Sequence, residues 1–284
     1  MISPLVKCSP FIKWAGGKRQ LLTELDCRLP PAWNTYYEPF IGGGALLVHL
    51  ENKGILSRGI ISDLNGELIN LYRVVQDTPG ALITALFSED FQNNEDSYKK
   101  MKERFNTLIG SRTHAVERAA LLIYLNKHGF NGLWRVNRKG KFNVPFGSYK
   151  KRSIPSDTSI LKFSAMLEKV KILNKDFAAA VKTARKGDFI YFDPPYQPLS
   201  KTASFTDYNS RGFPFEEQER LARLFTRLDK KGVQLMLSNS KVPEIEDLYE
   251  DFLIETVDAK RFINCNGERR KGIQEIIVTN YFRN

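Results

Sequence analysis

Short apolar runs alternate along this chain with segments of helical periodicity, and this alternation constrains the fold more than any other feature. Runs typical of buried strands cover residues 36–38, 59–63, 170–173, 188–193, 233–238 and 273–279. Apolar residues three to four positions apart predict helices at 45–51, 67–76, 177–184, 214–228 and 244–249. Strands that alternate with helices form a doubly wound sheet with helices on both faces. The sequence therefore predicts an α/β fold.

The stretch from residue 78 to residue 150 interrupts this alternation. Helical patterns at 81–87, 98–108 and 115–127 follow one another with no strand between them. The turn-prone, basic tetrad Asn137-Arg138-Lys139-Gly140 then separates two apolar segments, which predicts a β-hairpin at 130–147 with a positively charged tip. We expect residues 1–77 and 151–284 to form one domain, into which residues 78–150 are inserted as a helical subdomain.

Positive charge is concentrated in and around this insertion. The chain carries 43 Lys and Arg residues against 32 Asp and Glu residues, a net charge of +11. Residues 118–156 contain no acidic residue but nine basic ones, namely Arg118, Lys127, Arg135, Arg138, Lys139, Lys141, Lys150, Lys151 and Arg152. Such clustering favours a polyanionic partner such as a nucleic acid, with a solvated basic surface as the alternative.

The composition disfavours several other classes of protein. No apolar run reaches the length of about 18 residues that a membrane-spanning helix requires. Residues 1–10 lack the basic and apolar regions of a secretory signal, and Cys8, Cys27 and Cys265 form an odd, widely spaced set. We expect a cytoplasmic protein with free thiols, no membrane association, no disulfide framework and no metal site.

The sharpest chemical signal is Asp193-Pro194-Pro195-Tyr196, at the end of a predicted strand. A carboxylate at the carboxyl end of a buried strand faces the crevice where α/β sheets bind ligands. The prolines hold the turn rigid, and their carbonyl groups remain free as acceptors. A carboxylate and a carbonyl can together accept both N–H bonds of an exocyclic amino group while the tyrosine ring stacks on a base. A tight turn capped by the aspartate is the structural alternative.

A second candidate site follows the strand predicted at 36–38, where Glu38-Pro39-Phe40-Ile41-Gly42-Gly43-Gly44-Ala45 leads through a glycine turn into a helix. Such a turn lets the backbone approach a bound nucleoside and exposes the N-terminus of the helix. Asp63 ends the next predicted strand, where it can accept hydrogen bonds from ribose hydroxyls or cap the following helix. The Gly-x-Gly-x-x-Gly spacing of dinucleotide-binding turns is absent. A cofactor with a ribose and no pyrophosphate fits these features.

The order of these motifs resembles that of the Dam-type DNA adenine N6-methyltransferases. The resemblance runs from about residue 11 to residue 281, and its motifs lie at 13–18, 38–44, 131–137, 142–147 and 193–196. It implies a Rossmann-like methyltransferase sheet with a final antiparallel strand, and an inserted DNA-recognition subdomain. It further implies that the enzyme transfers a methyl group from S-adenosylmethionine to the N6 amino group of adenine in double-stranded DNA, typically within GATC.

The resemblance also implies roles for individual residues. The implied catalytic residues are Asp193, Pro194, Pro195 and Tyr196. The implied S-adenosylmethionine contacts are Trp14, Lys18, Phe40, Gly42, Gly44, Asp63, Asp176, Phe177 and Asp193. The implied DNA contacts are Lys13, Phe130, Asn131, Leu133, Arg135, Asn137, Arg138, Lys139, Pro145 and Tyr149, with Phe130 as a wedge in the opened duplex. Family members often have Gly-Arg-Tyr where this chain has Gly147-Ser148-Tyr149, so one basic contact is absent or is provided by Lys150.

The expected mechanism is base flipping followed by direct methyl transfer, since no motif positions a cysteine as a nucleophile. Asp193 and the carbonyl of Pro194 would accept the amino hydrogens of an adenine that stacks on Tyr196. A cytosine N4- or protein-glutamine methyltransferase is one alternative, although Ser or Asn tends to precede Pro-Pro in those families. A non-catalytic DNA-binding regulator is the other. The sequence leaves open whether the enzyme is functionally paired with a restriction endonuclease, without a stable complex, or acts alone. Residues 258–272 are either a further DNA contact or a disordered loop.

Overall fold

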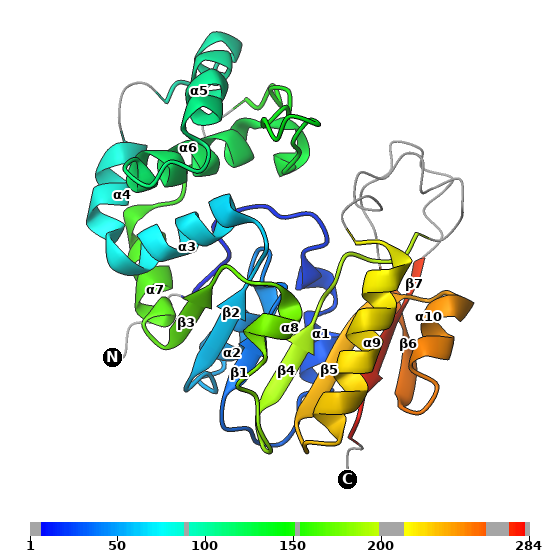
Figure 1. Cartoon of the computed structure of the whole chain (residues 1–284). Helices are drawn as coiled ribbons and strands as arrows, with labels where there is room; N and C mark the ends of the chain where they lie inside the picture. Colours follow the sequence, from blue (N-terminus) through cyan, green and yellow to red (C-terminus); the bar gives the residue numbers. More distant parts are fainter. Residues whose placement is uncertain (1–6, 88–90, 151–153, 199–212, 260–272, 282–284) are drawn as a thin grey trace. The chain divides into compact units, whose positions relative to one another are not determined.

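The strands of the chain form a single sheet in the computed structural model, which describes residues 7–87, 91–150, 154–198, 213–259 and 273–281. In the described part this sheet has seven strands in the order β3-β2-β1-β4-β5-β7-β6 (Figure 1). The strands are β1 Tyr36–Glu38, β2 Gly59–Ser62, β3 Val170–Leu173, β4 Phe189–Phe192, β5 Gln234–Ser240, β6 Leu253–Ala259 and β7 Ile273–Thr279. β1 pairs in parallel with β2 and β4, and β4 with β5, whereas β7 runs antiparallel to both β5 and β6. The predicted α/β sheet with a final antiparallel strand is confirmed.

The strand predictions agree with the structure to within two residues at each end, and one strand was missed. The missed strand is β6, which pairs along its whole length with β7 and lies at the edge of the sheet. Its sequence mixes apolar and polar residues, as in Leu253-Ile254-Glu255-Thr256-Val257. This half-exposed pattern lacks the continuous apolar run that marks a central strand.

Two compact units make up the chain. The first comprises Met1–Gly17, Gly42–Ser57 and Ser62–Asn174, and the second comprises Lys18–Ile41, Arg58–Ile61 and Lys175–Asn284. We call them unit 1 and unit 2. They are defined by compactness alone. The predicted assignment of residues 1–77 and 151–284 to catalysis and of residues 78–150 to DNA recognition concerns function and stays a prediction.

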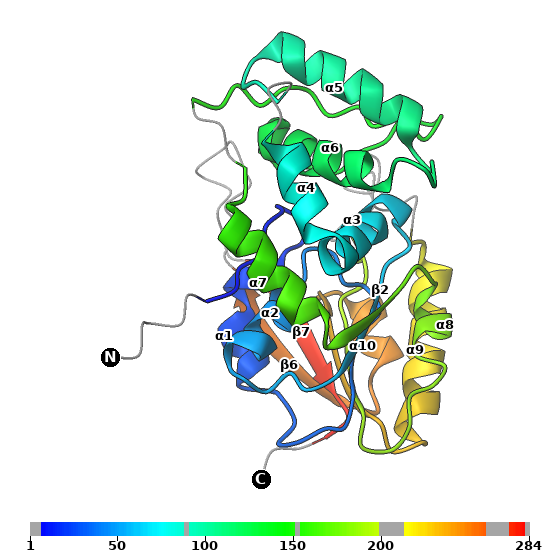
Figure 2. The ribbon, with the colours of Figure 1, turned by 90° about the vertical axis from the view of Figure 1, so that its left-hand side faces the viewer.

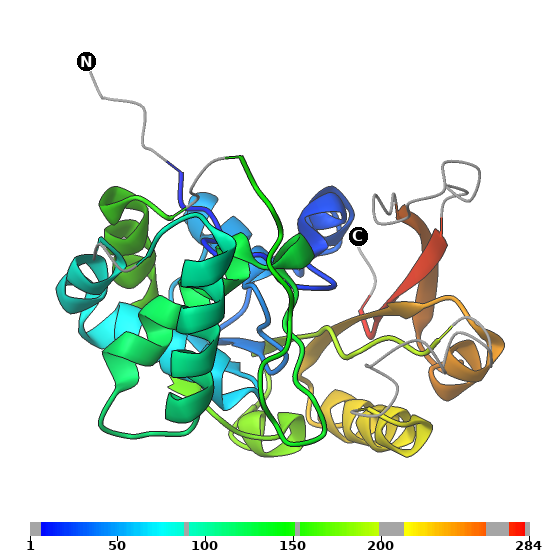
Figure 3. The ribbon, with the colours of Figure 1, turned by 90° about the horizontal axis from the view of Figure 1, so that it is seen from above.

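Unit 1 is mainly helical. Its helices are α2 Ala45–Asn52, α3 Gly66–Asp77, α4 Pro79–Leu86, α5 Glu95–Leu108, α6 Ala115–His128 and α7 Asp157–Leu167, with a short 3-10 turn at Phe130–Gly132. α6 is almost wholly buried from residue 119 to residue 125 and contacts α3, α4 and α5. Figure 2 and Figure 3 show α5 lying alongside α6. Arg118 of α6 forms a buried ion pair with Glu67 of α3, which ties these two helices together. The three helices predicted for the insertion are therefore present as α4, α5 and α6, whereas α7 was not predicted.

The predicted β-hairpin at 130–147 is present only as a loop with two isolated antiparallel bridges, between Val136 and Phe142 and between Gly129 and Phe146. We call residues 130–147 the basic loop. The side chain of Asn137 accepts hydrogen bonds from the backbone N–H groups of Lys139 and Lys141. Backbone hydrogen bonds also join the two arms, from the N–H of Asn137 to Lys141 and from the N–H of Asn143 to Arg135. The tetrad therefore turns the chain and the arms pair antiparallel, as predicted, but the pairing forms no continuous strand.

Unit 2 contains β1, most of β2, β4, β5, β6 and β7, with helices on two sides. The helices are α1 Leu22–Asp26, α8 Phe177–Ala180, α9 Phe215–Asp229 and α10 Pro243–Leu248, with a 3-10 turn η1 at Lys18–Gln20. Figure 2 shows α8 and α9 on one side of these strands and α1 on the other. The core joins strand and helix side chains, among them Ile190, Phe192, Leu235, Leu237, Leu221, Phe225, Ile245 and Val278. α8 is shorter than the predicted 177–184, because the chain turns after Ala180 while Val181 and Ala184 still pack in the core. α1 was not predicted.

The helices of the described part are all too short or too polar to cross a membrane.

Candidate active site

The Asp193 loop, which we define as residues 193–197, follows β4 directly. Parallel pairing of β4 with β1 and β5 buries every residue of Phe189–Phe192, so the strand delivers Asp193 to the carboxyl edge of the sheet. The Asp193 side chain is only 19% exposed. The Nζ atom of Lys18, from η1, lies 2.7 Å from its Oδ1 atom. Oδ1 accepts no hydrogen bond from any other described residue. The loop thus presents a largely buried carboxylate with a single close cation.

A polar network fixes the backbone of this loop. Gln218 of α9, which is fully buried, donates its amide N–H to the carbonyl oxygen of Pro195 at 2.9 Å and accepts from the amide of Asn239 at 3.1 Å. Asn239 in turn accepts from the backbone N–H of Gln197 at 3.3 Å. The hydroxyl of Ser240 donates to the carbonyl oxygen of Gln197 at 2.6 Å. The loop is therefore held from α9 at Pro195 and from β5 at Gln197, and sequence reasoning missed these supports.

Two contacts hold the side chain of Tyr196, one at its hydroxyl and one over its ring. Its hydroxyl donates to Oε2 of Glu275, on β7, at 2.7 Å. Nζ of Lys18 lies 4.5 Å from the centre of its ring, which is a cation–π contact. Lys18 therefore contacts both the carboxylate and the aromatic ring of the loop.

The pKa of the Asp193 carboxyl lies close to neutral pH. Burial raises the pKa of its carboxyl to about 6, with Lys18 lowering the pKa and Glu275 raising it. At pH 7 the group is mainly ionised and therefore an acceptor only. Burial, with the nearby Asp193, also raises the pKa of Tyr196, so its hydroxyl stays protonated as the donor to Glu275.

Asp63 and the glycine turn form a second cluster, in unit 1. The carboxylate of Asp63 accepts from the backbone N–H of Gly42 at 3.2 Å and from that of Asn65 at 2.9 Å. The N-cap of α3 is Asn65, whose side chain accepts from Glu67 and Leu68, so the capping alternative for Asp63 does not hold. Burial raises the pKa of Asp63. Each carboxylate oxygen keeps a lone pair beyond these two bonds, which suits a ribose diol.

Trp14 packs directly on the glycine turn. A Cβ atom built on Gly42 would lie 2.9 Å from Cδ1 of Trp14, and Gly42 and Gly44 both have positive φ angles, of 45° and 68°. A side chain at position 42 would therefore be both strained and in collision with the indole. Gly44 begins α2 with no side-chain cap, which leaves the first N–H groups of this helix without a side-chain acceptor.

Leu64, which follows Asp63, was not predicted as a site residue. It is 67% exposed, an unusual position for a large apolar side chain next to a buried carboxylate. The sequence feature that could have identified Leu64 is its position directly after Asp63, the acidic residue that ends the predicted strand.

The other predicted cofactor residues lie in unit 2. The ring of Phe40 stacks on that of Phe177, with centroids 5.4 Å apart, and Phe177 is only 2% exposed. Asp176 caps α8 by accepting from the backbone N–H of Ala178 and is also paired with Arg220, whose hydrogen bonds lower the pKa of the Asp176 carboxyl. Much of the Asp176-Phe177 pair is thus already engaged within the protein.

Lys13 and the basic loop are joined within unit 1 by Asn126 of α6. Asn126 accepts from the backbone N–H of Lys13 at 2.8 Å and donates to the carbonyl oxygens of Lys13 and Gly132 at 2.7 and 2.9 Å. Trp14 stacks on Trp134 of the loop, with ring centroids 6.2 Å apart. The Nζ atom of Lys13 lies 5.1 Å from the ring centre of Tyr149. The predicted DNA contacts Lys13 and Tyr149 therefore lie together, and Asn126 and Trp134 are supports that the sequence did not reveal.

Most other predicted DNA contacts are accessible. Phe130 is 50% exposed. Asn131, Arg138, Lys139 and Pro145 are exposed, and Leu133 and Asn137 are half-buried. Arg135 donates from Nε to the side-chain oxygen of Asn143 at 2.8 Å and from Nη2 to its carbonyl oxygen at 2.9 Å. The guanidinium keeps N–H groups beyond these two bonds, so it is both oriented and available. Residues 260–272, the greater part of the predicted contact at 258–272, lie outside the described residues.

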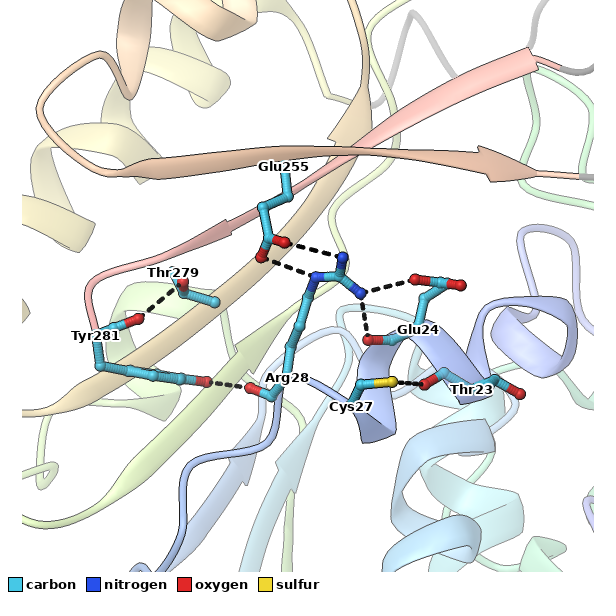
Figure 4. Close-up of polar contacts among 7 residues, drawn as sticks. All are labelled: Thr23, Glu24, Cys27, Arg28, Glu255, Thr279 and Tyr281. Atoms are coloured by element: carbon cyan, nitrogen blue, oxygen red, sulfur yellow. Dashed lines mark hydrogen bonds and ion pairs between the residues drawn. The ribbon is translucent and has the colours of Figure 1, made fainter. Parts of the chain in front are cut away.

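A cavity of about 450 Å³ in unit 2 lies apart from the predicted site residues. It is lined by Glu24, Cys27, Arg28, Leu253, Glu255, Thr279 and Tyr281. Figure 4 shows that the guanidinium of Arg28 is already bonded to Glu24 and Glu255. Among the described residues, no group of three or more His, Cys, Asp or Glu side chains could hold a metal ion.

Comparisons with known proteins identify the family of the chain. Residues 14–263 match the family described as D12 class N6 adenine-specific DNA methyltransferase. The type II methyltransferase M1.LlaDCHI of Lactococcus lactis subsp. cremoris is 44% identical over 278 residues, which are 97% of this chain and 96% of that protein. The type II methyltransferase M.MjaIII of Methanocaldococcus jannaschii is 42% identical over 97% of this chain and its own full length. The DNA adenine methylase of Escherichia coli K12 is 33% identical over 94% of each chain.

The expected Dam-type resemblance is thereby confirmed, together with the Rossmann-like methyltransferase fold, adenine-specific DNA methylation as the activity and S-adenosylmethionine as the methyl donor. The alternatives of a cytosine or protein methyltransferase and of a non-catalytic regulator are not supported. The chain belongs to the D12 class of N6 adenine-specific DNA methyltransferases.

Proposed function

We propose that this enzyme methylates adenine within GATC in double-stranded DNA, that it flips the target base out of the helix, and that it transfers the methyl group directly. The observation that carries the proposal is the Asp193 loop, a rigid turn that presents a buried carboxylate and an oriented tyrosine ring together. An adenine inside a duplex cannot reach such a turn, because its amino group is paired and its faces are stacked.

In the proposed mechanism the Asp193 loop binds the extruded base. The ring of Tyr196 offers a stacking surface, and Asp193 and the carbonyl of Pro194 accept the two amino hydrogens. These acceptors draw the lone pair of the amino nitrogen out of conjugation with the ring. Bound S-adenosylmethionine supplies an electrophilic methyl group on a sulfonium centre. Asp193, with a pKa of about 6, can take up the proton that the nitrogen loses.

The same proposal assigns the cofactor contacts. In unit 1, Asp63 is the acceptor for ribose hydroxyls, Trp14, Gly42 and Gly44 form the adjacent turn, and the exposed Leu64 offers an apolar surface. In unit 2, we assign Lys18, Phe40, Asp176, Phe177 and Asp193 to the cofactor as the family resemblance implies. The donors and acceptors that these residues present fit a nucleoside carrying a carboxylate and an amino group.

For DNA recognition we assign base contacts to Arg135, Leu133 and Pro145, and phosphate contacts to the exposed Arg138 and Lys139. An oriented arginine suits bidentate hydrogen bonding to guanine in the major groove. Phe130 is exposed as a wedge should be. Since two relatives are type II methyltransferases, we propose that the enzyme protects DNA from a partner restriction endonuclease without forming a stable complex with it.

The first test is Asp193→Ala. We expect duplex binding to remain within a few-fold of wild type, while tritium transfer from labelled S-adenosylmethionine falls at least 1,000-fold, about the effect of removing a key electrostatic group. The wild-type enzyme should also raise the fluorescence of 2-aminopurine placed at the target adenine, which reports unstacking. Retained transfer by the variant contradicts the role of Asp193, and a constant fluorescence contradicts flipping.

The second test addresses the sequence. Plasmid DNA recovered from cells that express the enzyme should resist an endonuclease that cuts only unmethylated GATC. Methyladenine found in the plasmid without such resistance would place the activity at another sequence.

A further inference from the structure

β7 brings a buried acidic residue to the Asp193 loop. The strand is inserted antiparallel between β5 and β6, and its register sets Glu275 opposite Ser240 on one side and Val257 on the other. Glu275 is only 6% exposed, in a strand that otherwise continues with the apolar Ile276, Ile277 and Val278. A carboxylate at such a position is costly unless strong partners compensate its burial.

One partner of Glu275 is the hydroxyl of Tyr196, which donates to Oε2 at 2.7 Å. A hydrogen bond from a hydroxyl to an ionised carboxylate is among the stronger kinds in proteins. Because the backbone of Tyr196 lies in a fixed loop, holding the hydroxyl sets the direction of the whole ring. Lys18 lies over one face of the ring, 4.5 Å from its centre.

We propose that Glu275 is a positioning residue for methyl transfer, which aims the ring of Tyr196 at the flipped adenine through its hydroxyl and acts by its charge on the neighbouring Asp193. The inference rests on the proposed function, because it requires that Tyr196 stacks on the base. Glu275 itself touches neither the base nor the cofactor in this account.

The charge of Glu275 has a separate consequence. Among the described residues, the ionisable groups that share this buried region are Lys18 of η1, Tyr36 and Glu38 of β1, Tyr191 of β4, Tyr196 and Glu275. Burial raises the pKa of Asp193 to about 6, with Lys18 lowering it and Glu275 raising it. Since only ionised Asp193 can take up the proton that the amino nitrogen loses, kcat/KM of the wild-type enzyme should fall as the pH drops through about 6. Without the negative charge of Glu275, Asp193 should remain ionised to lower pH.

Three variants separate the two contributions. Glu275→Gln keeps an oxygen that accepts from Tyr196 and removes the charge, so kcat at pH 8 should stay within a few-fold of wild type while the acid limb of kcat/KM moves to lower pH. Glu275→Leu removes both the acceptor oxygen and the charge, and kcat should fall roughly 100-fold, the cost of a misplaced reacting group. Tyr196→Phe removes the hydroxyl alone, so kcat should fall by a similar factor while the acid limb keeps its wild-type position.

A double variant tests whether Glu275 and Tyr196 act as a pair. If Glu275 works through the Tyr196 hydroxyl, kcat at pH 8 of Glu275→Leu with Tyr196→Phe should equal that of either single variant, because the second substitution removes an interaction already lost. A purely structural role predicts losses that multiply. Glu255→Gln, on the neighbouring strand β6, is the matched control and should change neither kcat nor the acid limb.

The outcomes are distinguishable. Wild-type kcat in Glu275→Leu and Tyr196→Phe, both shown to be folded by thermal unfolding and by calorimetric binding of S-adenosylmethionine, overturns the positioning role while methyl transfer by the wild-type enzyme still supports the proposed function. An acid limb that Glu275→Gln leaves in place overturns the role of the charge. A wild-type enzyme that gives no 2-aminopurine signal contradicts base flipping, and the role of Glu275 is then overturned with it.

Discussion

The Asp193 loop and the basic loop differ in what they present to a ligand. Around the Asp193 loop, buried side chains of α9, β5 and β7 make directional hydrogen bonds to the carbonyl of Pro195, to both backbone groups of Gln197 and to the hydroxyl of Tyr196. The backbone of the basic loop is held by hydrogen bonds from Asn106, Tyr98 and Asn126 and by the stack of Trp134 on Trp14. Its basic side chains at 138, 139 and 141 are exposed. The first region holds its carboxylate and its ring largely inside the protein, whereas the second presents charged side chains to solvent.

Substitutions should affect the two loops differently. Removing one partner of a buried hydrogen bond leaves the other unsatisfied, at a cost of about 1–3 kcal/mol per group. An aromatic pair contributes about 0.5–1.5 kcal/mol beyond its buried area and tolerates replacement by another ring. An exposed lysine contributes mainly long-range attraction. Substitutions should therefore have abrupt effects in the Asp193 loop and graded effects in the basic loop.

The largest effect is expected for Gln218→Leu, which keeps the approximate volume of the side chain but deprives the Pro195 carbonyl and the Asn239 amide of their partner. We expect the free energy of unfolding to fall by about 2–4 kcal/mol, the cost of two buried groups left unsatisfied. Below the unfolding transition, kcat should fall about 100-fold because the loop is no longer fixed. Chemical denaturation and single-turnover methyl transfer measure the two effects.

Glu219→Gln is the control for this variant. It lies on the same helix, α9, with a side chain that is 42% exposed, and should behave as wild type in both assays. A wild-type single-turnover rate in Gln218→Leu would show that the loop is rigid without its network.

The Gln218 network also shows where the sequence stopped being informative. The sequence alone identified Asp193-Pro194-Pro195-Tyr196 and Asp63, because each follows an apolar run that predicts a strand. The bonds of Gln218 to Pro195, of Glu275 to Tyr196 and of Asn126 to Lys13 span 23, 79 and 113 positions. Nothing local distinguishes Gln218, Glu275 and Asn126 from any other polar residue in a helix or strand. Only strand order and register bring these groups together.

The second largest effect is expected for Arg135→Ala. We expect the preference for a GATC duplex over one with a single changed base to drop by about 1–3 kcal/mol, the discrimination of one bidentate base contact. Asn143→Ala, which removes one of the two acceptors that orient Arg135, should lower the preference less. Competition binding at one fixed salt concentration measures both. Equal weakening on the two duplexes would exclude Arg135 as a base reader.

The fold was predictable to the same degree as the chemistry, and for a similar reason. The strands β1, β2, β3, β4, β5 and β7 and the helices α2 to α6 are marked by local apolar runs and periodicity. β6 mixes polar and apolar residues without such a run, and it was missed. The turn and the antiparallel pairing of the basic loop were predicted from the tetrad at 137–140. Local periodicity did not reveal that this pairing stops short of a continuous strand.

A graded effect is expected for Trp134→Ala, which removes the ring that supports Trp14 on the glycine turn. The affinity for S-adenosylmethionine, measured by calorimetry without DNA, should fall about tenfold, as for loss of one aromatic pair. Trp134→Phe should restore most of it because another ring can stack. Unchanged cofactor affinity in Trp134→Ala would show that the basic loop and the glycine turn are independent despite their contact.

The smallest effect is expected for Lys139→Ala, at the exposed tip of the basic loop, because a phosphate contact is screened by salt and replaceable by its neighbours. Cognate and unrelated duplexes should both bind a few-fold more weakly, and the slope of log K against log salt should become shallower by about 0.9, the release of one counterion. The comparison of the two regions depends on this insensitivity to sequence. If Lys139→Ala weakens the GATC duplex far more than the unrelated one, the tip reads bases, and the basic loop must be ordered in the complex as firmly as the Asp193 loop is here.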